Sequence, residues 1–535
     1  MRVARAMAAE YARPRAANAI MLAALCIGLG NVASRLLGLV RVSAVAAYFG
    51  RGPAVDAYAA AWTVPNTVYD ILISGMASAA VVPVLSAYAE GDQREFRQIV
   101  GSLFSIVLLA LLALSLLLAW QTPLVVRLLV RESQPALFAA TVRLVRLLLP
   151  AVLVLGLSGV ATAALYAQRA FLWPAFAGAA FNLGMIIGVV LLHDRLGVTS
   201  LAAGALIGAL GQLALQAVGL RKLRLALTLG LHHPALRRML RLCAPVVLGI
   251  MFFIAGTLLD RWLASGFPTA LATMQYATTL VQFPLGLVAA AVALAVLPTL
   301  ARQSAAVQEA AFRQTLALGL KLVLLLIVPA AIGLAALAGP IAALLFERGA
   351  FVGSDTTATA QALLCYLPGM PATAVAQVLL FALYARQRTL APNVVQGAAI
   401  IVYLLVALPL LWLTRLGFLA LVLGNAAQWI GHMLLLLLLL GREVSLRGLR
   451  IGEALGKSAL AGTLMAATML GLVAGLAHAQ PLIQLAVAGG LGALLYVSLC
   501  LVLRVEALGF VIHEATRRAA KGWGRDDPRS DAKGR

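Results

Sequence analysis

Residues 101–120, GSLFSIVLLALLALSLLLAW, contain no charged side chain and no proline. An α-helix of about 20 such residues crosses the roughly 30 Å hydrocarbon core of a bilayer. Similar apolar segments recur along the chain between charged or Pro/Gly-rich breaks, and they predict about fourteen membrane-spanning helices. These segments start near Ala17, Ala57, Gly101, Leu137, Trp173, Ser200, Leu242, Leu271, Leu316, Thr357, Pro392, Gly417, Leu455 and Leu482.

The composition of the whole chain also excludes a water-soluble protein. Hydrophobic residues make up 63% of the 535 residues and charged residues 11%, whereas soluble domains have roughly 45–50% and about 25%. A single core in water also stops growing beyond about 250–300 residues. We therefore predict an all-α membrane protein. The first apolar stretch is longer than the core of a signal peptide, so we expect that span to be retained.

The basic residues are concentrated on one side of the predicted membrane. The formal net charge is +22, and most Lys and Arg residues lie in short runs between spans. We interpret this as the positive-inside pattern of a membrane protein and not as nucleic-acid binding. The densest runs follow even-numbered spans, so those connections and both termini are predicted to be cytoplasmic, and the odd-numbered connections to face outward. These basic residues are Arg2, Arg5, Arg13, Arg15, Arg221, Lys222, Arg224, Arg237, Arg238, Arg241, Arg442, Arg447, Arg450, Lys457, Arg517, Arg518, Lys521 and Arg525.

An internal duplication divides the chain. Landmarks of the first half recur in the second after a shift of 215–218 residues, for example Pro83 with Pro298 and Leu165-Tyr166-Ala167 with Leu383-Tyr384-Ala385. Equivalent points are six spans apart, and because six is even the halves are parallel repeats, between which transporters commonly bind substrate. The predicted domains are an N-terminal lobe (1–225, spans 1–6), a C-terminal lobe (226–441, spans 7–12), spans 13–14 (442–505) and a basic cytoplasmic tail (506–535).

Two arginines in the first span are the main candidates for ligand binding. Arg35 and Arg41 lie in an apolar segment with no acidic residue within one helical turn of either. A charge at mid-bilayer costs about 2.5–3.5 kcal/mol, so such residues usually face a cavity or a partner. Arginine matches the geometry of a phosphate with paired hydrogen bonds, and a diphosphate head group is the ligand we expect. The alternatives are that Arg41 reaches the outer interface, or that both arginines pair with carboxylates of other helices.

The seventh span carries a further charged pair, Asp260-Arg261. Neighbouring residues on a helix point about 100° apart, so these two side chains need different partners. Arg261 is a third candidate for the diphosphate, and Asp260 for gating or structure. A purely structural pairing with another helix is equally compatible with the sequence. Asp56, at the start of the second span, is a gating candidate that is also compatible with simple exposure at the interface.

Helix-breaking residues occur at corresponding places in the two halves. Pro65-Asn66 lies in the second span, and Pro284 in the eighth. Proline in a membrane helix frees backbone groups that other helices or cavity water must satisfy, and it allows bending. We interpret Pro65, Asn66 and Pro284 as gating or structural positions, with either a moving hinge or a static kink.

No motif for bond chemistry is present in the sequence. A Gly-x-x-x-x-Gly-Lys-Ser/Thr loop is absent, so direct use of ATP is not expected. We expect neither an enzyme nor a cofactor, a metal site or a nucleic-acid partner. The single cysteines are interpreted as small hydrophobic residues, because none is part of a CxxC pair. They are Cys26, Cys243, Cys365 and Cys500.

Several short motifs, in their order and spacing, resemble the MurJ (MviN) lipid II flippases of the multidrug/oligosaccharidyl-lipid/polysaccharide exporter superfamily. They are Ser34-Arg35-Leu-Leu-Gly38-Leu-Val-Arg41, Asp56-Ala-Tyr58, Val64-Pro65-Asn66, Val82-Pro83-Val84-Leu85, Asp260-Arg261-Trp-Leu-Ala264-Ser265, Gln282-Phe-Pro284-Leu-Gly286, Leu344-Leu-Phe346-Glu347-Arg348-Gly349-Ala350-Phe351 and Leu383-Tyr384-Ala385. The resemblance implies two six-helix lobes around a cationic cavity, with two extra helices that form a groove for a lipid tail. It implies a bacterial inner-membrane protein that flips the undecaprenyl-diphosphate-linked precursor lipid II by alternating access. Its expected partners are that lipid, membrane lipids and other cell-wall synthesis proteins.

By this resemblance Arg35 and Arg41 match essential arginines of the family, and Asp56 matches its acidic residue at the outer end of the second helix. The chain departs from the pattern at two places, where Tyr69-Asp70 and Thr278-Thr279 replace arginine-containing motifs. Asp260 matches one sodium ligand of some members, but Tyr403 and Ala407 stand at the positions expected for others. We therefore expect coupling to membrane potential or to an ion gradient.

Three alternative functions remain open at the level of sequence. A flippase for another polyprenyl-diphosphate-linked oligosaccharide would keep the arginines. A cation-drug antiporter of the same superfamily would instead have mainly acidic cavity residues. A non-transporting scaffold that binds lipid would be compatible with the loss of cavity arginines.

Overall fold

A computed structural model of the chain describes residues 2–72, 81–89, 91–223, 228, 233–388, 390–510 and 516. Side chains are not described for 2–25, 222, 244–250, 253, 290, 294 and 390. Some sequence predictions therefore lie outside the described part: Arg224, the domain boundary at 225–226, the tail residues Arg517, Arg518, Lys521 and Arg525, and the side chains of Lys222, Arg2, Arg5, Arg13 and Arg15.

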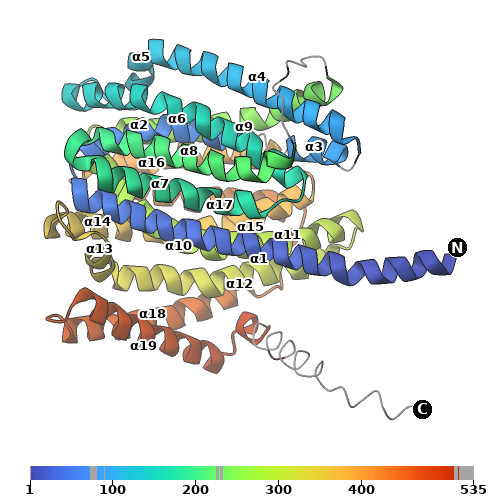
Figure 1. The fold of residues 1–535 in the computed structure, drawn as a ribbon. Helices are drawn as coiled ribbons and strands as arrows, with labels where there is room; N and C mark the ends of the chain where they lie inside the picture. Colours follow the sequence, from blue (N-terminus) through green and yellow to red (C-terminus); the bar gives the residue numbers. More distant parts are fainter. Residues whose placement is uncertain are drawn as a thin grey trace. The chain divides into compact units, whose positions relative to one another are not determined.

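Every regular element in the described residues is helical (Figure 1). The first half contains α1 (Arg2–Phe49), α2 (Pro53–Asp70), α3 (Val82–Ala89), α4 (Gln93–Trp120), α5 (Thr122–Arg127), α6 (Pro135–Ala167), α7 (Leu172–Leu196), α8 (Thr199–Leu220) and η2 (Arg221–Leu223). The second half contains α9 (Pro234–Ala264), α10 (Ala270–Pro284), η3 (Leu285–Ala289), α11 (Ala290–Ala305), α12 (Glu309–Ala336), α13 (Ala338–Phe346), α14 (Gly353–Tyr366), η4 (Leu367–Gly369), α15 (Met370–Ala385), α16 (Leu390–Leu413) and α17 (Leu419–Gly441). Two C-terminal helices follow, α18 (Ile451–Gly475) and α19 (Pro481–Val502).

The predicted all-α membrane fold is confirmed. Twelve helical segments of the described residues are long and apolar enough to cross a membrane, and they match predicted spans one, three to six, and eight to fourteen. The other two predicted spans begin in α2 and α9. Both run into residues, or side chains, outside the described part. A helix satisfies its own backbone groups, which is why apolar segments of this length form helices in lipid.

The second spans of the two halves depart from regular α-helix. After Pro284 the helix widens to the π-helix η3, and after α2 residues 71–72 also have π geometry. π-Segments and prolines are common causes of bends in helices. The irregular turns therefore follow the prolines at which the sequence predicts bending. Whether these places act as hinges stays a prediction.

One compact unit consists of Met1–Thr279, Leu345–Ala362 and Gln396–Val422. Within it α7 and α8 lie side by side (Figure 1), with glycines on the facing surfaces. A Cβ atom added at Gly188 would lie 2.3 Å from the Cα of Gly204, and one at Gly184 would lie 2.5 Å from the Cα of Gly208. Small residues let helix backbones approach closely in membranes. This contact fixes α7, on which α1 packs.

A chain of buried polar side chains joins α6 to α8 in the same unit. Gln212 donates from Nε2 to Ser158 Oγ (2.7 Å), and Ser158 donates to Oε1 of Gln216 (2.6 Å). Gln216 donates in turn to Thr162 Oγ1 (2.7 Å), and Gln212 also donates to the hydroxyl of Tyr69 in α2 (2.9 Å). The amide nitrogens of both buried glutamines therefore have hydrogen-bond partners, as burial in an apolar surrounding requires.

The other compact unit consists of Leu280–Leu344, Leu363–Val395 and Leu423–Arg535. Its α12 packs on α18, and α18 lies beside α19 (Figure 1). Met465 and Met469 of α18 are buried there together with Tyr496 of α19. The Tyr496 hydroxyl donates to the carbonyl of Leu325 in α12 (2.7 Å). These contacts attach the C-terminal helix pair to α12. The predicted domain boundaries rest on the sequence repeat and stay predictions.

Candidate substrate-binding and gating site

Arg35 and Arg41 both lie in the apolar part of α1, and both are half-buried. They are six positions apart in the sequence, which places their side chains roughly 120° apart around the helix. The α7 residue Asn182 orients this part of α1, because its Nδ2 donates to the carbonyl of Ser34 (3.0 Å). Arg41 lies close to Tyr58 of α2. The structure thus holds both guanidinium groups on one apolar helix, and their binding of an anion stays a prediction.

Asp56 is not solvated at an interface but almost fully buried, with 2% of its surface exposed. Its Oδ1 accepts a hydrogen bond from the backbone N–H of Ala272 in the first turn of α10 (2.7 Å). A carboxylate at a helix N-terminus satisfies an unpaired N–H and interacts favourably with the helix dipole. Asp56 of the first half therefore caps a helix of the second half, and the reading of Asp56 as an exposed interfacial residue is corrected.

Further contacts join the same connections. Arg51 donates from Nε to Asp355 (2.9 Å) and from a terminal nitrogen to Thr273 Oγ1 (3.2 Å). The Tyr276 hydroxyl donates to the carbonyl of Gly50 (2.6 Å). Sequence reasoning did not identify Arg51, Tyr276 or Asp355 as site residues. A usable signal was present for Arg51, because it is a charge in an otherwise charge-poor, odd-numbered connection.

Two glycines permit this close approach. Gly50 has φ +61° and Gly349 has φ +58°, a region that glycine occupies without strain. A Cβ at Gly50 would lie 2.5 Å from the carbonyl oxygen of Ala350, and one at Gly349 would lie 2.3 Å from that of Ala47. The N–H of Ala350 donates to the carbonyl of Ala47 (2.8 Å). We call this set of contacts, formed by residues 47–56, 272–276 and 349–355, the closure cluster.

Asp260 and Arg261 have different surroundings, as their adjacency predicts. Asp260 accepts a hydrogen bond from the hydroxyl of Tyr403 in α16 (3.0 Å). Two nitrogens of Arg261, Nε and Nη1, are buried without a hydrogen-bond partner among the described residues. Arg261 interacts electrostatically with Asp56. The structure therefore brings Arg261 to the closure cluster, and its role in diphosphate binding stays a prediction.

The remaining predicted positions lie along the irregular spans. Pro65 is buried inside α2, and Asn66 is exposed and donates to Oδ2 of Asp70 (2.8 Å). Pro284 is the last residue of α10, directly before η3. At the two places where the resemblance leads us to expect arginines, the side chains are neutral or acidic. Thr279 is engaged with its own helix through the carbonyl of Gln275 (2.8 Å).

Comparison with known proteins gives consistent results. The family model for "Lipid II flippase MurJ" matches residues 45–487. A probable lipid II flippase MurJ of Rhizobium tropici is 30% identical over 387 residues, which cover 69% of this chain and 71% of that protein. The lipid II flippase MurJ of Burkholderia cenocepacia is 27% identical over 368 residues, 66% of this chain and 71% of that protein.

Solved structures support the same fold. A lipid II flippase MurJ in an inward closed conformation superposes with a TM-score of 0.74 at 22% identity, covering 90% of this chain and 99% of that one. An inward-facing multidrug resistance transporter of the MATE family gives a TM-score of 0.62 at 14% identity, covering 80% and 96%. Arg35 and Arg41 precede the residues that the family model matches. Their assignment therefore depends on their own motif and on the cost of charge in the membrane.

Proposed function

The chain belongs to the MurJ lipid II flippase family, and from that membership we propose that it moves lipid II from the cytoplasmic to the outer leaflet of the bacterial inner membrane. Lipid II is a peptidoglycan precursor linked to a polyprenyl diphosphate. Movement across the bilayer breaks no covalent bond, so the protein acts as a transporter and not as an enzyme. Both termini are cytoplasmic in this proposal, in agreement with the basic even-numbered connections.

The observation that carries the mechanism is the pair of arginines in the apolar part of α1. A diphosphate brings at least two negative charges, which offset the cost of holding Arg35 and Arg41 within the membrane. Planar guanidinium groups can bind the phosphate oxygens in pairs while partly desolvated. The sugar and peptide then need few specific contacts, and the lipid tail stays in the bilayer throughout.

The closure cluster supports alternating access as the transport cycle. Its contacts link odd-numbered connections of the two halves, which the charge pattern assigns to the outer side. Closed in this way, the protein admits the head group from the cytoplasm and blocks its exit. Opening of the outer side requires Asp56 and Arg51 to leave their partners. Membrane potential or an ion gradient is the proposed energy source, and other cell-wall synthesis proteins are the proposed neighbours.

A second candidate is a flippase for a different polyprenyl-diphosphate-linked oligosaccharide. The neutral side chains Tyr69 and Thr279 favour it, because they lower the positive charge where the family has arginines. Both hydroxyls are used within the protein, Tyr69 with Gln212 and Thr279 with Gln275. In that case the diphosphate would be bound only by Arg35 and Arg41 of α1 and by Arg261.

Replacement of a depleted lipid II flippase tests both candidates. We expect cells that rely on this chain to grow and to expose lipid II on the outer leaflet, measured with an impermeant probe. Arg35→Ala and Arg41→Ala should each reduce that signal at least about tenfold, the size of one lost charged hydrogen bond. Arg415→Ala is the control, because Arg415 is exposed between spans eleven and twelve. Full complementation by both α1 variants would refute anion capture, whereas exposure of a different glycan would favour the second candidate.

A further inference from the structure

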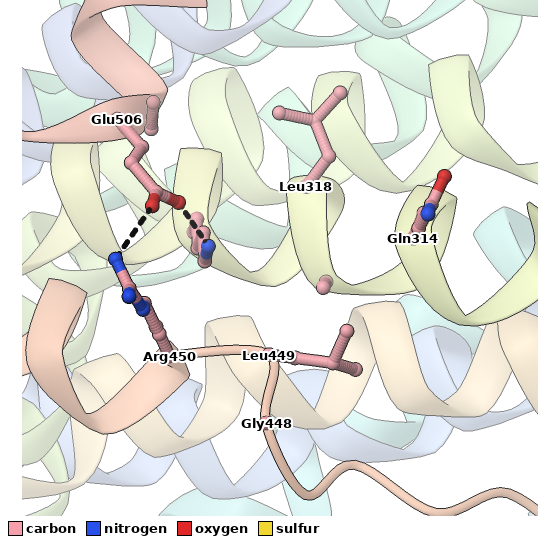
Figure 2. Close-up of a pocket in the computed structure, with 9 residues that line it drawn as sticks. Gln314, Leu318, Gly448, Leu449, Arg450 and Glu506 are labelled. Carbon is pink, nitrogen blue, oxygen red and sulfur yellow. Dashed lines mark hydrogen bonds and ion pairs between the residues drawn. The ribbon is translucent and has the colours of Figure 1, made fainter.

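A pocket of about 340 Å³ lies near the start of α12, beside the start of α18 and the end of α19. Figure 2 shows that its walls come from α12, from the loop before α18 and from the segment after α19. The walls include Gln314, Leu318, Lys321, Leu449, Arg450 and Glu506. All of them belong to one compact unit. None takes part in the closure cluster or lies on α1.

The pocket contains two cations and one carboxylate. Glu506 forms an ion pair with Lys321 through one oxygen, and its other oxygen is 3.9 Å from a terminal nitrogen of Arg450. The Nε of Arg450 is also 3.9 Å from Glu453. Both distances exceed that of a hydrogen bond, so the guanidinium keeps its donors for another acceptor. The side chain of Arg450 is 69% exposed, whereas that of Lys321 is 12% exposed.

The backbone around Arg450 leaves the entrance open. Arg450 has φ +52° and Gly448 has φ +80°, so the loop turns sharply before α18 begins. A Cβ atom at Gly448 or at Gly452 would meet nothing within 4 Å. Val505 and Ala507, on either side of Glu506, are buried. They anchor the backbone on both sides of Glu506.

The position of the pocket indicates which anion reaches it. It lies where α12 and α18 start and α19 ends, beside a loop that carries Arg442 and Arg447. The positive-inside pattern assigns these ends to the cytoplasmic surface, where anionic phospholipids gather. Side chains at the end of α19 are apolar and exposed, such as Leu501 (52%) and Val502 (77%). Leu318 and Leu449 give the pocket itself an apolar wall.

We propose that this pocket binds the phosphate head group of an anionic phospholipid of the cytoplasmic leaflet. Arg450 and Lys321 hold the phosphate, and Leu318 and Leu449 contact the glycerol and the first acyl carbons. When no lipid is bound, the Glu506 carboxylate pairs with Lys321, so it competes with the phosphate for this cation. The two cations and one carboxylate leave a single net positive charge, which matches the single negative charge of phosphatidylglycerol.

Native mass spectrometry of the purified full-length protein tests the proposal with short-chain phosphatidylglycerol. We expect binding at least about tenfold tighter than that of short-chain phosphatidylcholine, which carries a phosphate but no net charge. Arg450→Gln should weaken phosphatidylglycerol binding by about tenfold, and Arg450→Lys should restore most of it. Glu506→Gln should have the opposite effect and tighten binding several-fold, because it removes the competing carboxylate.

Arg442→Gln is the matched control, because it removes one charge from the same loop at an exposed residue outside the pocket. Equal losses in Arg442→Gln and Arg450→Gln would show general surface attraction and overturn the proposal. Equal binding of the two lipids would also overturn it. Displacement by millimolar inorganic phosphate as effective as displacement by the lipid would assign the pocket to free phosphate instead. Arg450 is exposed, so its variants are expected to fold, and thermal unfolding of each variant verifies this.

Discussion

Asp56 combines two tasks in one carboxylate. It satisfies the N–H of Ala272 at the start of α10, and it faces the charge of Arg261. Both interactions form only when the two halves are in contact at this end. A buried carboxylate without such partners would be strongly disfavoured. The residue therefore links the stability of the closed arrangement to the position of α10.

Replacement of Asp56 tests whether this residue does more for the protein than cap a helix. We expect Asp56→Ala to lower the free energy of unfolding by about 1 kcal/mol, the usual cost of a lost cap, and to abolish complementation. Asp92→Ala is the control, because Asp92 caps α4 through the N–H of Arg94 (2.7 Å) and lies outside the closure cluster. Asp92→Ala should lower the free energy of unfolding by a similar amount and leave growth of the complemented cells unchanged. Loss of growth in both variants would mean that stability alone decides the outcome.

At the scale of elements, the connection between α1 and α2 is built around Gly50. Its positive φ allows the turn, and its missing side chain allows contact with Ala350. The first requirement concerns the backbone conformation of residue 50, and the second concerns the room left for its side chain. Another glycine, Gly417 between α16 and α17, has a similar φ of +56° but open space around it.

Gly50→Ala and Gly417→Ala therefore form a matched pair. Both should cost roughly 1 kcal/mol from backbone strain. Only Gly50→Ala places a methyl group against a backbone oxygen that cannot move aside, so it should prevent the closure cluster from forming. The measurement is labelling of Thr273→Cys, in a variant without the native cysteines, by an impermeant thiol reagent in intact cells. Thr273 is fully buried here, and labelling should rise about tenfold with Gly50→Ala only. No difference between the pair would contradict this role of Gly50.

The elements also show what sequence can predict. Long apolar runs predict the spans because the length of a helix that crosses lipid is fixed by the bilayer. Asp56 and Arg261 were identified because a charge in an apolar segment is costly wherever the chain folds. Arg51 and Asp355 were missed, since they are 304 positions apart and only the folded protein brings them together. The polar chain from Gln212 to Thr162 was missed for the same reason.

At the scale of the whole molecule, the distribution of charge predicts the direction of every span. The predicted orientation assigns the connection at Arg415 to the outer side and that at Arg442 to the cytoplasm. Both residues are exposed. We expect Arg415→Cys to react with an impermeant thiol reagent in intact cells, and Arg442→Cys to react only after permeabilisation. The opposite pattern would invert the proposed direction of transport, although it would leave the fold unchanged.

The family resemblance in the sequence is confirmed at this scale, because matches of family, relatives and fold extend over most of the chain. The reason is physical. Motifs such as Gly349-Ala350 and Asp56-Ala-Tyr58 lie where backbones touch or where a buried charge needs one particular partner. Such places tolerate little change. At Tyr69-Asp70 and Thr278-Thr279 the chain departs from the arginines that the resemblance leads us to expect.

The chain of hydrogen-bonded side chains between α6 and α8 limits which substitutions the protein tolerates at these positions. Gln212 and Gln216 each use their amide for more than one neighbour, so an apolar substitution at either would strand two buried groups at once. Random mutagenesis of the protein should find that these two glutamines tolerate substitution almost as poorly as the arginines of α1. Variants that survive there would have to replace a glutamine together with the hydroxyl groups bonded to it, which are those of Ser158 and Tyr69 for Gln212 and those of Ser158 and Thr162 for Gln216.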